Sequence, residues 1–307
     1  MHCSKGRAKK MKRKGRSLNR TEPIVYVFYG FVALVALICL MPFWLIVIGS
    51  FSKESDVLKF GYSLWPKNWS LAAYEMVFNV PQRIVQGYKV SITITAVGTF
   101  VSLFLSSMAA FVLMRKDFTH RNKVAMFLYF PSIFSGGMLP SYLLIVKYLG
   151  LKDNIWALIL PGMISAWNIF LLRNFMTDIP SSISESAKID GANDFQIFIK
   201  FYLPLSKAGL ATIGLFTALG YWNSWSNAML YINDQNLFPL QYLLYSMLSN
   251  AQGAQDLAAA AGVSVSNLPS ETYKMAMAVV TTGPIVLLYP FVQKYFVKGI
   301  TVGSVKG

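Results

Sequence analysis

The chain has 307 residues, of which 55% are hydrophobic and 13% are charged, and its mean hydropathy is +0.47. This is too apolar for an ordinary soluble domain of this length, so the composition indicates a membrane protein. The net charge is +15, and the two cysteines and two histidines form no cluster, so neither a disulfide framework nor a metal site is expected.

Six stretches of the chain contain no Asp, Glu, Lys, Arg or His. Each is near or above the ~20 residues that a helix needs to cross a bilayer at ~1.5 Å per residue. Buried helices of soluble proteins rarely run that long without a charge, so we expect an all-α, polytopic membrane fold with six transmembrane helices. The stretches are roughly 24–48, 90–114, 124–146, 155–172, 208–232 and 275–293.

The chain begins with a basic tail. Residues 1–20 contain nine Lys or Arg and no acid. Basic tails can bind nucleic acid, but this one directly precedes a membrane span, so the positive-inside rule places it in the cytoplasm and no nucleic-acid partner is expected. We therefore divide the chain into a cytoplasmic tail at 1–23 and a six-span domain at 24–307.

Six spans return the C-terminus to the cytoplasm. The inner segments 115–123, 173–207 and 294–307 hold 11 Lys or Arg in 58 residues, and the outer segments 49–89, 147–154 and 233–274 hold 8 in 91. This bias supports an N-in and C-in topology. A cleaved signal peptide has an apolar core of roughly 7–15 residues, shorter than the first span, so we expect that span to be retained, with Met11 as an alternative start.

Spans three and four contain breaker and polar residues. Span three has the pattern of a kinked or broken helix that lines a cavity, with Pro131, Ser132, Ser135, Gly136, Gly137 and Pro140. Span four contributes Trp167 and Asn168 to the same candidate pathway.

Residues 178–206 form the polar segment between spans four and five. Pro180 followed by Ser182-x-x-Glu185 is a capping-box pattern that predicts a short helix from about Ile183. Gly191 interrupts that helix, because glycine alone adopts a left-handed or bent backbone without strain.

A second short helix is expected after this glycine, with Asp190, Asn193 or Asp194 as its cap. Its apolar residues follow i, i+3, i+4, i+7 spacing and form one stripe, namely Phe195, Phe198, Ile199 and Tyr202, and Pro204 ends or kinks it. The helix either lies on lipid headgroups or docks into a groove of a partner protein, and its aromatic residues either contact that partner or pack on this chain.

Span five carries a polar and aromatic cluster, which consists of Tyr221, Trp222, Asn223, Ser224, Trp225, Ser226 and Asn227. In one continuous helix, the pairs Trp222/Trp225 and Asn223/Asn227 would each share a side. An unpaired polar group in lipid costs several kcal/mol, so such groups line a pathway or hold helices together. Tryptophans also occur in interfacial belts.

The predicted spans contain no ionisable residue, which argues against a proton-driven or ion-driven carrier without excluding one. No P-loop is present, so energy for uphill transport would have to come from another chain. No nucleophile elbow or Ser/His/Asp set supports a membrane enzyme.

The order Glu185-Ser186-Ala187, Asp190-Gly191-Ala192, Leu203-Pro204 resembles the "EAA" loop of binding-protein-dependent ABC importer permeases. The resemblance implies a type I permease fold and a coupling helix that docks on a separate ATPase, with Glu185 facing a basic residue of the ATPase and Gly191 permitting the turn. The coupling residues are then Glu185, Ala187, Asp190, Gly191, Ala192, Phe195, Phe198, Leu203 and Pro204.

The resemblance is closest to the carbohydrate branch, which includes maltose-permease-like subunits, on Trp222-Asn223 and on residues 135–162. It implies an importer of oligosaccharides in a bacterial plasma membrane, although a glycerophosphate ester or a peptide remains an alternative cargo. The sugar pathway would consist of Tyr221, Trp222, Asn223, Trp225, Asn227, Trp167, Asn168 and Ser135.

The resemblance also implies the partners of this chain. They are a homologous second permease, a dimer of cytoplasmic ATPases, an extracellular substrate-binding protein and the lipid bilayer. The two longest outer segments, 49–89 and 233–274, would receive the binding protein, and their length suggests structure of their own, such as a short helix around Ala258–Ala261. No cofactor is expected in this chain, because ATP and Mg²⁺ would bind to the ATPase.

Overall fold

The computed structural model describes residues 23–79, 81–260 and 271–304, so the predicted tail at 1–23 lies outside the described residues except for its last one. Within these ranges the chain is helical, apart from loops and an isolated bridge between Ser52 and Trp69. The helices, with η for short π or 3₁₀ turns, are α1 (Pro23–Ser50), α2 (Glu54–Phe60), α3 (Ala72–Phe78), α4 (Pro81–Met114), α5 (Arg121–Ile133), α6 (Met138–Leu143), η1 (Leu144–Tyr148), α7 (Trp156–Ile159), η2 (Leu160–Gly162), α8 (Ala166–Thr177), α9 (Ser181–Ile189), α10 (Asp194–Ile197), η3 (Phe198–Tyr202), α11 (Leu203–Leu205), α12 (Lys207–Trp222), α13 (Ser226–Tyr231), η4 (Gln235–Leu237), α14 (Leu240–Ala260) and α15 (Glu271–Ser304).

Predicted spans one to four each coincide with a helix or with a bent pair of helices, whereas span five, predicted at 208–232, overlaps α12 and α13, and the bent pair recognised there begins earlier, at Asp194. Helices α1 and α4 are each long and apolar enough to cross a bilayer alone. Three pairs of helices pass the same test only when each pair is counted as one span. The chain bends by 113° between α5 and α6, by 54° between η2 and α8, and by 81° between α11 and α12. Among the described residues, up to five spans are therefore recognised by length and composition. The sixth predicted span lies within α15, which continues helically into the inner segment expected from residue 294.

The break in span three follows the predicted breaker residues. Helix α5 ends two residues after Pro131, and α6 begins after Gly137, which has a φ of +86°. Only glycine adopts that left-handed conformation readily. The prediction of a broken helix is therefore confirmed, but Ser135 in the break is exposed, and its hydroxyl accepts a hydrogen bond from the Gly137 N–H at 3.2 Å.

The prediction of one continuous helix over 208–232 is wrong. Helix α12 ends at Trp222, and α13 begins only at Ser226. Both tryptophans at the interruption contact residues far away in the sequence: Trp222 lies in a buried cluster with Leu240 and Met277, and the Trp225 ring stacks on Tyr245 with centroids 4.3 Å apart. These tertiary contacts outweigh the helix preference of the local sequence.

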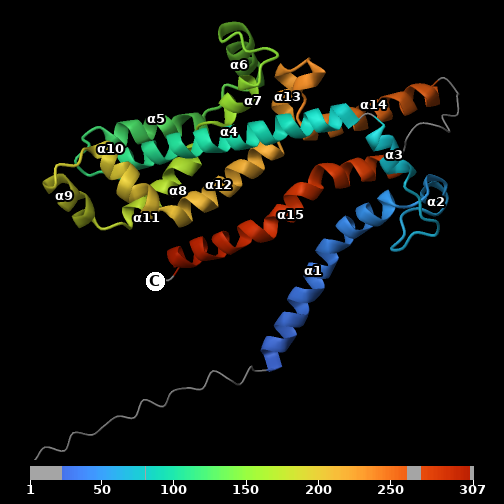
Figure 1. The fold of residues 1–307 in the computed structure, drawn as a ribbon, viewed down its shortest axis with the longest axis horizontal. Coiled ribbons are helices and arrows are strands. Elements are labelled where there is room, and N and C mark those ends of the chain that lie inside the picture. The colour runs from blue at the N-terminus through green and yellow to red at the C-terminus, as the bar shows by residue number, and fades with distance from the viewer. Residues whose placement is uncertain (1–22, 80, 261–270, 305–307) are drawn as a thin grey trace, which may run out of the picture.

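Helix α4 lies at the centre of the packing, against α12 and α8 (Figure 1). Small residues allow this close approach, as is common between membrane helices. A Cβ atom on Gly98 would lie 2.7 Å from the Tyr221 ring, and one on Gly214 would lie 3.0 Å from Leu103. The α4–α12 interface therefore requires glycine at Gly98, whereas a side chain at Gly214 would meet the end of the Leu103 side chain.

The two ends of the bundle carry different short helices. Helices α9 to α11 gather at one end, and α2 and α3 lie at the other (Figure 1). At the α2 end, the Glu54 carboxylate caps α15 by accepting hydrogen bonds from the N–H groups of Glu271 at 3.2 Å and Thr272 at 3.0 Å. Segments 49–89 and 233–274 contain α2, α3 and α14. The short helix expected around Ala258–Ala261 is instead the end of the 21-residue α14, and Ala261 lies outside the described residues.

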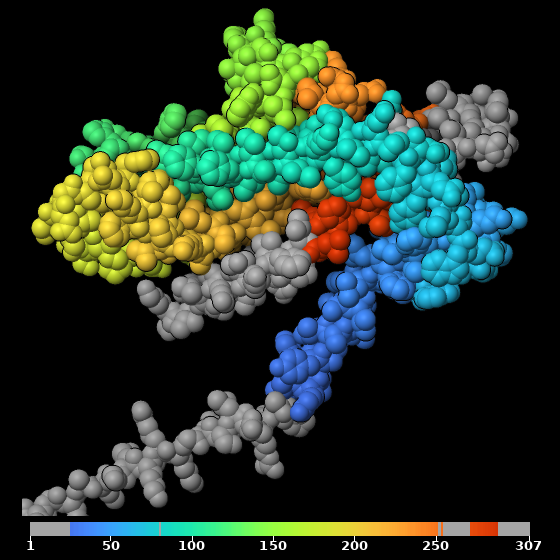
Figure 2. Space-filling model, viewed as in Figure 1, coloured from blue at the N-terminus to red at the C-terminus, as the bar shows by residue number. Residues whose placement is uncertain are grey.

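Helix α1 leaves the bundle (Figure 2). It packs on α15, but large apolar side chains along it are exposed, such as Phe28 and Leu37. An exposed apolar helix of this length requires lipid or another membrane helix around it.

Candidate functional site

The segment between α8 and α12 forms a helix–glycine–helix unit, as predicted. Helix α9 is followed by Gly191 at a φ of +81° and then by α10. The turn is closed by hydrogen bonds from the Gly191 N–H to the Lys188 carbonyl at 3.0 Å and from the Ala192 N–H to the Ala187 carbonyl at 2.9 Å. A left-handed glycine with this pair of bonds ends one helix and redirects the chain into the next.

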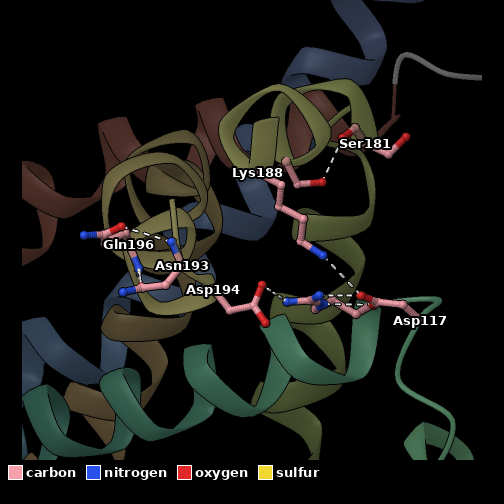
Figure 3. A network of polar contacts seen from close by, with 8 residues as sticks. Asp117, Ser181, Lys188, Asn193, Asp194 and Gln196 are labelled. Atoms are coloured by element: carbon pink, nitrogen blue, oxygen red, sulfur yellow. Dashed lines mark hydrogen bonds and ion pairs between the residues drawn. The ribbon is translucent and has the colours of Figure 1, made fainter. Parts of the chain in front are cut away.

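The capping box lies at the second helix rather than the first. Helix α9 begins at Ser181 with Pro180 in the cap position and no side-chain cap, so the predicted Ser182/Glu185 box is wrong. At α10 the Asn193 side chain accepts from the Gln196 N–H at 2.8 Å, and the Gln196 side chain accepts from the Asn193 N–H at 3.0 Å (Figure 3). Asn193-x-x-Gln196 is itself a capping-box pattern, so the sequence contained this signal.

The aromatic stripe of the second helix divides between the core and the surface. Phe198 and Tyr202 are buried, with ring centroids 5.4 Å and 5.0 Å from that of Phe111 at the end of α4. Phe195 is 57% exposed. Phe198 and Tyr202 therefore pack on this chain, and Phe195 is the one aromatic residue of the predicted stripe that presents its ring for a partner.

The predicted coupling residues divide in the same way. Exposed residues are Glu185, Asp190, Gly191, Phe195 and Pro204, partly buried ones are Ala192 and Leu203, and buried ones are Ala187 and Phe198. Sequence reasoning missed Ile189, which is 86% exposed immediately before the bend. An apolar side chain so exposed at the tip of a polar helix is a contact candidate that only the geometry reveals.

An ion-pair network joins this unit to the end of α4 (Figure 3). The Arg115 guanidinium donates from Nε to Asp117 Oδ1 at 2.9 Å, makes a second short bond to Asp117, and pairs with Asp194. Lys188 Nζ lies 3.4 Å from Asp117 Oδ2. The hydrogen bonds from Arg115 hold the pKa of the Asp117 carboxyl well below its usual range, so the pair is fully charged at neutral pH.

This network borders a polar cavity of about 660 Å³ beside α9, which Ser184, Glu185 and Lys188 line from that helix. The network was not anticipated from the sequence, because it joins residues 115–117 to residues 188–194, and the Asp117–Lys188 pair is separated by 71 positions. It shows that the connection after α4 is structurally part of the same end of the molecule as α9 and α10.

A second cavity, of about 420 Å³, lies where α12 meets η2 and α8. Its polar lining consists of Asn168, Thr217, Tyr221, Ser224 and Asn227, and its other lining residues are Leu158, Pro161, Gly162, Phe216 and Gly220. Three of the residues predicted for the sugar pathway, Asn168, Tyr221 and Asn227, therefore lie together. Ser224 belongs to the span-five cluster found in the sequence but was not assigned to the sugar pathway, and Thr217 and the apolar walls were missed because they lie outside that cluster.

Two of these polar groups also hold helices together. The Asn168 amide donates to the Thr217 hydroxyl at 3.2 Å, and the Tyr221 hydroxyl donates to the Ile159 carbonyl at 2.9 Å. The cavity offers amide, hydroxyl and aromatic groups and no charged side chain among its lining residues. Such a surface suits the hydroxyl groups and ring faces of a sugar.

The other predicted pathway residues do not line this cavity. Trp222 is buried on the side of α14 and α15, and Asn223 is exposed at the end of α12. Trp225 stacks on Tyr245, Trp167 is 71% exposed, and Ser135 lies in the span-three break. The helical spacing that paired Trp222 with Trp225 and Asn223 with Asn227 is absent because α12 stops at Trp222 and α13 begins at Ser226.

Within the part of the chain that the structure describes, no group of three or more His, Cys, Asp or Glu side chains is arranged to hold a metal ion. The two features that bring functional chemistry together are therefore the helix–glycine–helix unit with its ion pairs and the polar cavity on α12.

Comparisons with known proteins agree with this architecture. Polygalacturonan/rhamnogalacturonan transport system permease protein YtcP of Bacillus subtilis (strain 168) is 46% identical over 281 residues, which cover 92% of this chain and 97% of that protein. Protein LplC of Bacillus subtilis (strain 168) is 41% identical over 279 residues, covering 90% of this chain and 92% of that protein.

A solved structure of a bacterial ABC transporter involved in the import of the acidic polysaccharide alginate has a chain with a TM-score of 0.77 to this one. The two are 30% identical, and the match covers 89% of this chain and 96% of that chain. The fold is thus that of a type I ABC importer permease. A family model described as binding-protein-dependent transport system inner membrane component matches residues 8–302. The chain therefore belongs to this family of multi-pass membrane components of ABC transporters.

Proposed function

We propose that the chain is the permease subunit of an ATP-driven importer of oligosaccharides and that it works by alternating access. The observation that carries the proposal is the helix–glycine–helix unit, which presents Glu185, Ile189 and Phe195 to the exterior at one end of the bundle. A separate ATPase would seat this unit in a cleft, and closure of the ATPase dimer would move it.

The partners follow from the same proposal. ATP and Mg²⁺ bind to the ATPase, and this chain supplies no catalytic residue. A second, homologous permease completes the channel, and a substrate-binding protein docks on the segments around α2, α3 and α14. The basic tail and the α9 end lie in the cytoplasm, so that both termini are on the cytoplasmic side of the bacterial plasma membrane.

The polar cavity on α12 supports a sugar as cargo. Asn168, Ser224 and Asn227 offer hydrogen bonds, and the Tyr221 ring offers an aromatic face. The relative YtcP is named for the transport of polygalacturonan and rhamnogalacturonan, and the solved structure is of a transporter involved in alginate import. Oligosaccharides derived from acidic polysaccharides are therefore the first cargo to test.

The test is uptake into proteoliposomes that contain this chain together with its second permease, its ATPase and its substrate-binding protein. Galacturonic acid trisaccharide, alginate trisaccharide and maltotriose are offered with and without ATP on the ATPase side. We expect ATP-dependent uptake of at least one of these sugars. Uptake driven by a sodium or proton gradient without the ATPase, or turnover of a sugar by this chain alone, would contradict the proposal.

A further inference from the structure

Arg115 is the residue at which the end of α4 meets the candidate coupling unit. It directly follows the last residue of α4, and its side chain is only 17% exposed. Its guanidinium faces two carboxylates, with two hydrogen bonds to Asp117 and an ion pair to Asp194. A planar guanidinium can hold two carboxylates in fixed directions, which a lysine ammonium cannot.

These contacts reach both sides of the bend at Gly191. Asp194 is the first residue of α10, so Arg115 holds α10 directly. Lys188, in the last turn of α9, pairs with the same Asp117 carboxylate, so α9 is held through Asp117. Both helices are thereby linked to the end of α4, in addition to the glycine turn that joins them to each other.

Apolar contacts lie directly behind the ion pairs. The guanidinium carbon lies 5.8 Å from the centre of the Phe111 ring, and that ring packs on Phe198 and Tyr202. Exposed ion pairs on their own contribute little to stability. A shielded guanidinium with several partners is more suited to fixing a direction between elements than to stabilising the fold.

We propose that Arg115 is a positioning residue for coupling: it fixes α9 and α10 to the inner end of α4, so that displacement of residues 181–205 enters the bundle through α4. Because α4 packs on both α12 and α8, a rigid connection there moves the walls of the polar cavity together. This inference rests on the proposed function, since it requires an ATPase that moves the unit.

The main test compares Arg115→Gln with Lys116→Gln in the complete complex. Lys116 is the adjacent cation, is exposed, and makes no ion pair among the described residues. In Arg115→Gln the two aspartates stay more than half exposed to water, so the chain is expected to fold and retain the ATPase. Galacturonic acid trisaccharide imported per ATP hydrolysed should fall roughly fivefold or more, whereas Lys116→Gln should match the wild type.

A second readout does not depend on the cargo. With Cys3 and Cys39 replaced by Ser, spin labels at Ser182 on α9 and Ile92 on α4 report the distance between these helices. In the wild type, ATP with vanadate should leave that distance unchanged, because the two helices move as one body. In Arg115→Gln the distribution should shift or broaden on addition of ATP with vanadate, and Arg115→Lys should lie between the two.

Asp194→Asn provides the matched partner variant. If both residues act through one contact, the double variant should lose no more coupling than the more damaged single variant. Lower yield or thermal stability of Arg115→Gln, with wild-type sugar per ATP and an unchanged label distance, would overturn the inference and leave Arg115 a purely structural residue. Failure of the wild-type complex to retain an ATPase or import with ATP would instead overturn the proposed function.

Discussion

Gly191 is the residue at which local backbone geometry and the candidate coupling function meet. Its φ is +81°, and a Cβ atom there would meet no other atom within 4 Å, so a substitution is opposed by backbone strain and not by lack of space. Gly191→Val should cost about 1–2 kcal/mol at the bend. The chain should still reach the membrane in normal amounts, but co-purification of the ATPase should be lost.

Gly61→Val is the matched control, because Gly61 has a φ of +73° with equally open surroundings at the α2 end of the molecule. It should retain the ATPase. Equal retention by the Gly191 and Gly61 variants would show that the angle of the bend does not matter for docking.

Trp222 and Asn227 are close in the sequence, but we expect Trp222 to stabilise the fold and Asn227 to contact the sugar. Trp222 is buried among residues of α14 and α15, so Trp222→Ala should lower the free energy of unfolding by about 3–5 kcal/mol, measured by thermal unfolding in detergent. Asn227 lines the polar cavity, so Asn227→Ala should leave stability nearly unchanged and reduce ATP-dependent uptake of sugar. If Asn227→Ala takes up sugar like the wild type, the polar residues of the cavity serve helix packing and not sugar binding.

The capping of α15 by Glu54 joins two elements that are far apart in the sequence. Glu54→Ala removes the acceptor for the N–H groups of Glu271 and Thr272 and should destabilise the protein by about 1 kcal/mol. Thermal unfolding in detergent measures this loss. Glu75→Ala on α3, where the side chain is exposed, should unfold like the wild type, and so would Glu54→Ala if the cap were unimportant.

Elements that depend on local chemistry could be predicted from the sequence. The uncharged stretches located the spans, Pro131 and Gly137 located the break in span three, and Gly191 located the bend between α9 and α10. The break in span five could not be predicted. No glycine or proline occupies 223–225, and the contacts that Trp222 and Trp225 make there, with Leu240, Met277 and Tyr245, are to residues distant in the sequence.

The candidate site shows the same division. The polarity of residues 178–206 and the order Glu185, Asp190, Gly191 are visible in the sequence. The burial of Ala187 and Phe198 depends on α4, and so does the ion pairing of Asp194 with Arg115. A periodic pattern indicates which residues share a face of a helix, but it does not show whether that face is covered by another helix of the same protein or by a partner.

The orientation of the whole molecule is a prediction from charge. The α2 end and the α9 end lie at opposite ends of the bundle (Figure 1). In a background without Cys3 and Cys39, a membrane-impermeant thiol reagent added to intact cells should label a cysteine at Ser63 but not one at Thr119 or Asn193. Gly262, which also belongs to a predicted outer segment, lies outside the described residues. Labelling at Asn193 from outside would reverse the topology.

The central claim is that the α9–α10 unit docks on an ATPase through Glu185, and a charge reversal tests it most directly. Glu185→Lys should reduce co-purification of the ATPase and ATP-dependent uptake, while Glu75→Lys at the opposite end should not. Changing basic residues of the ATPase cleft to Glu, one at a time, should identify one that partly restores both activities in the Glu185→Lys background. Normal ATPase retention and normal uptake by Glu185→Lys would contradict docking through this residue, and together with normal behaviour of Gly191→Val they would leave residues 185–205 as an ordinary interfacial helix.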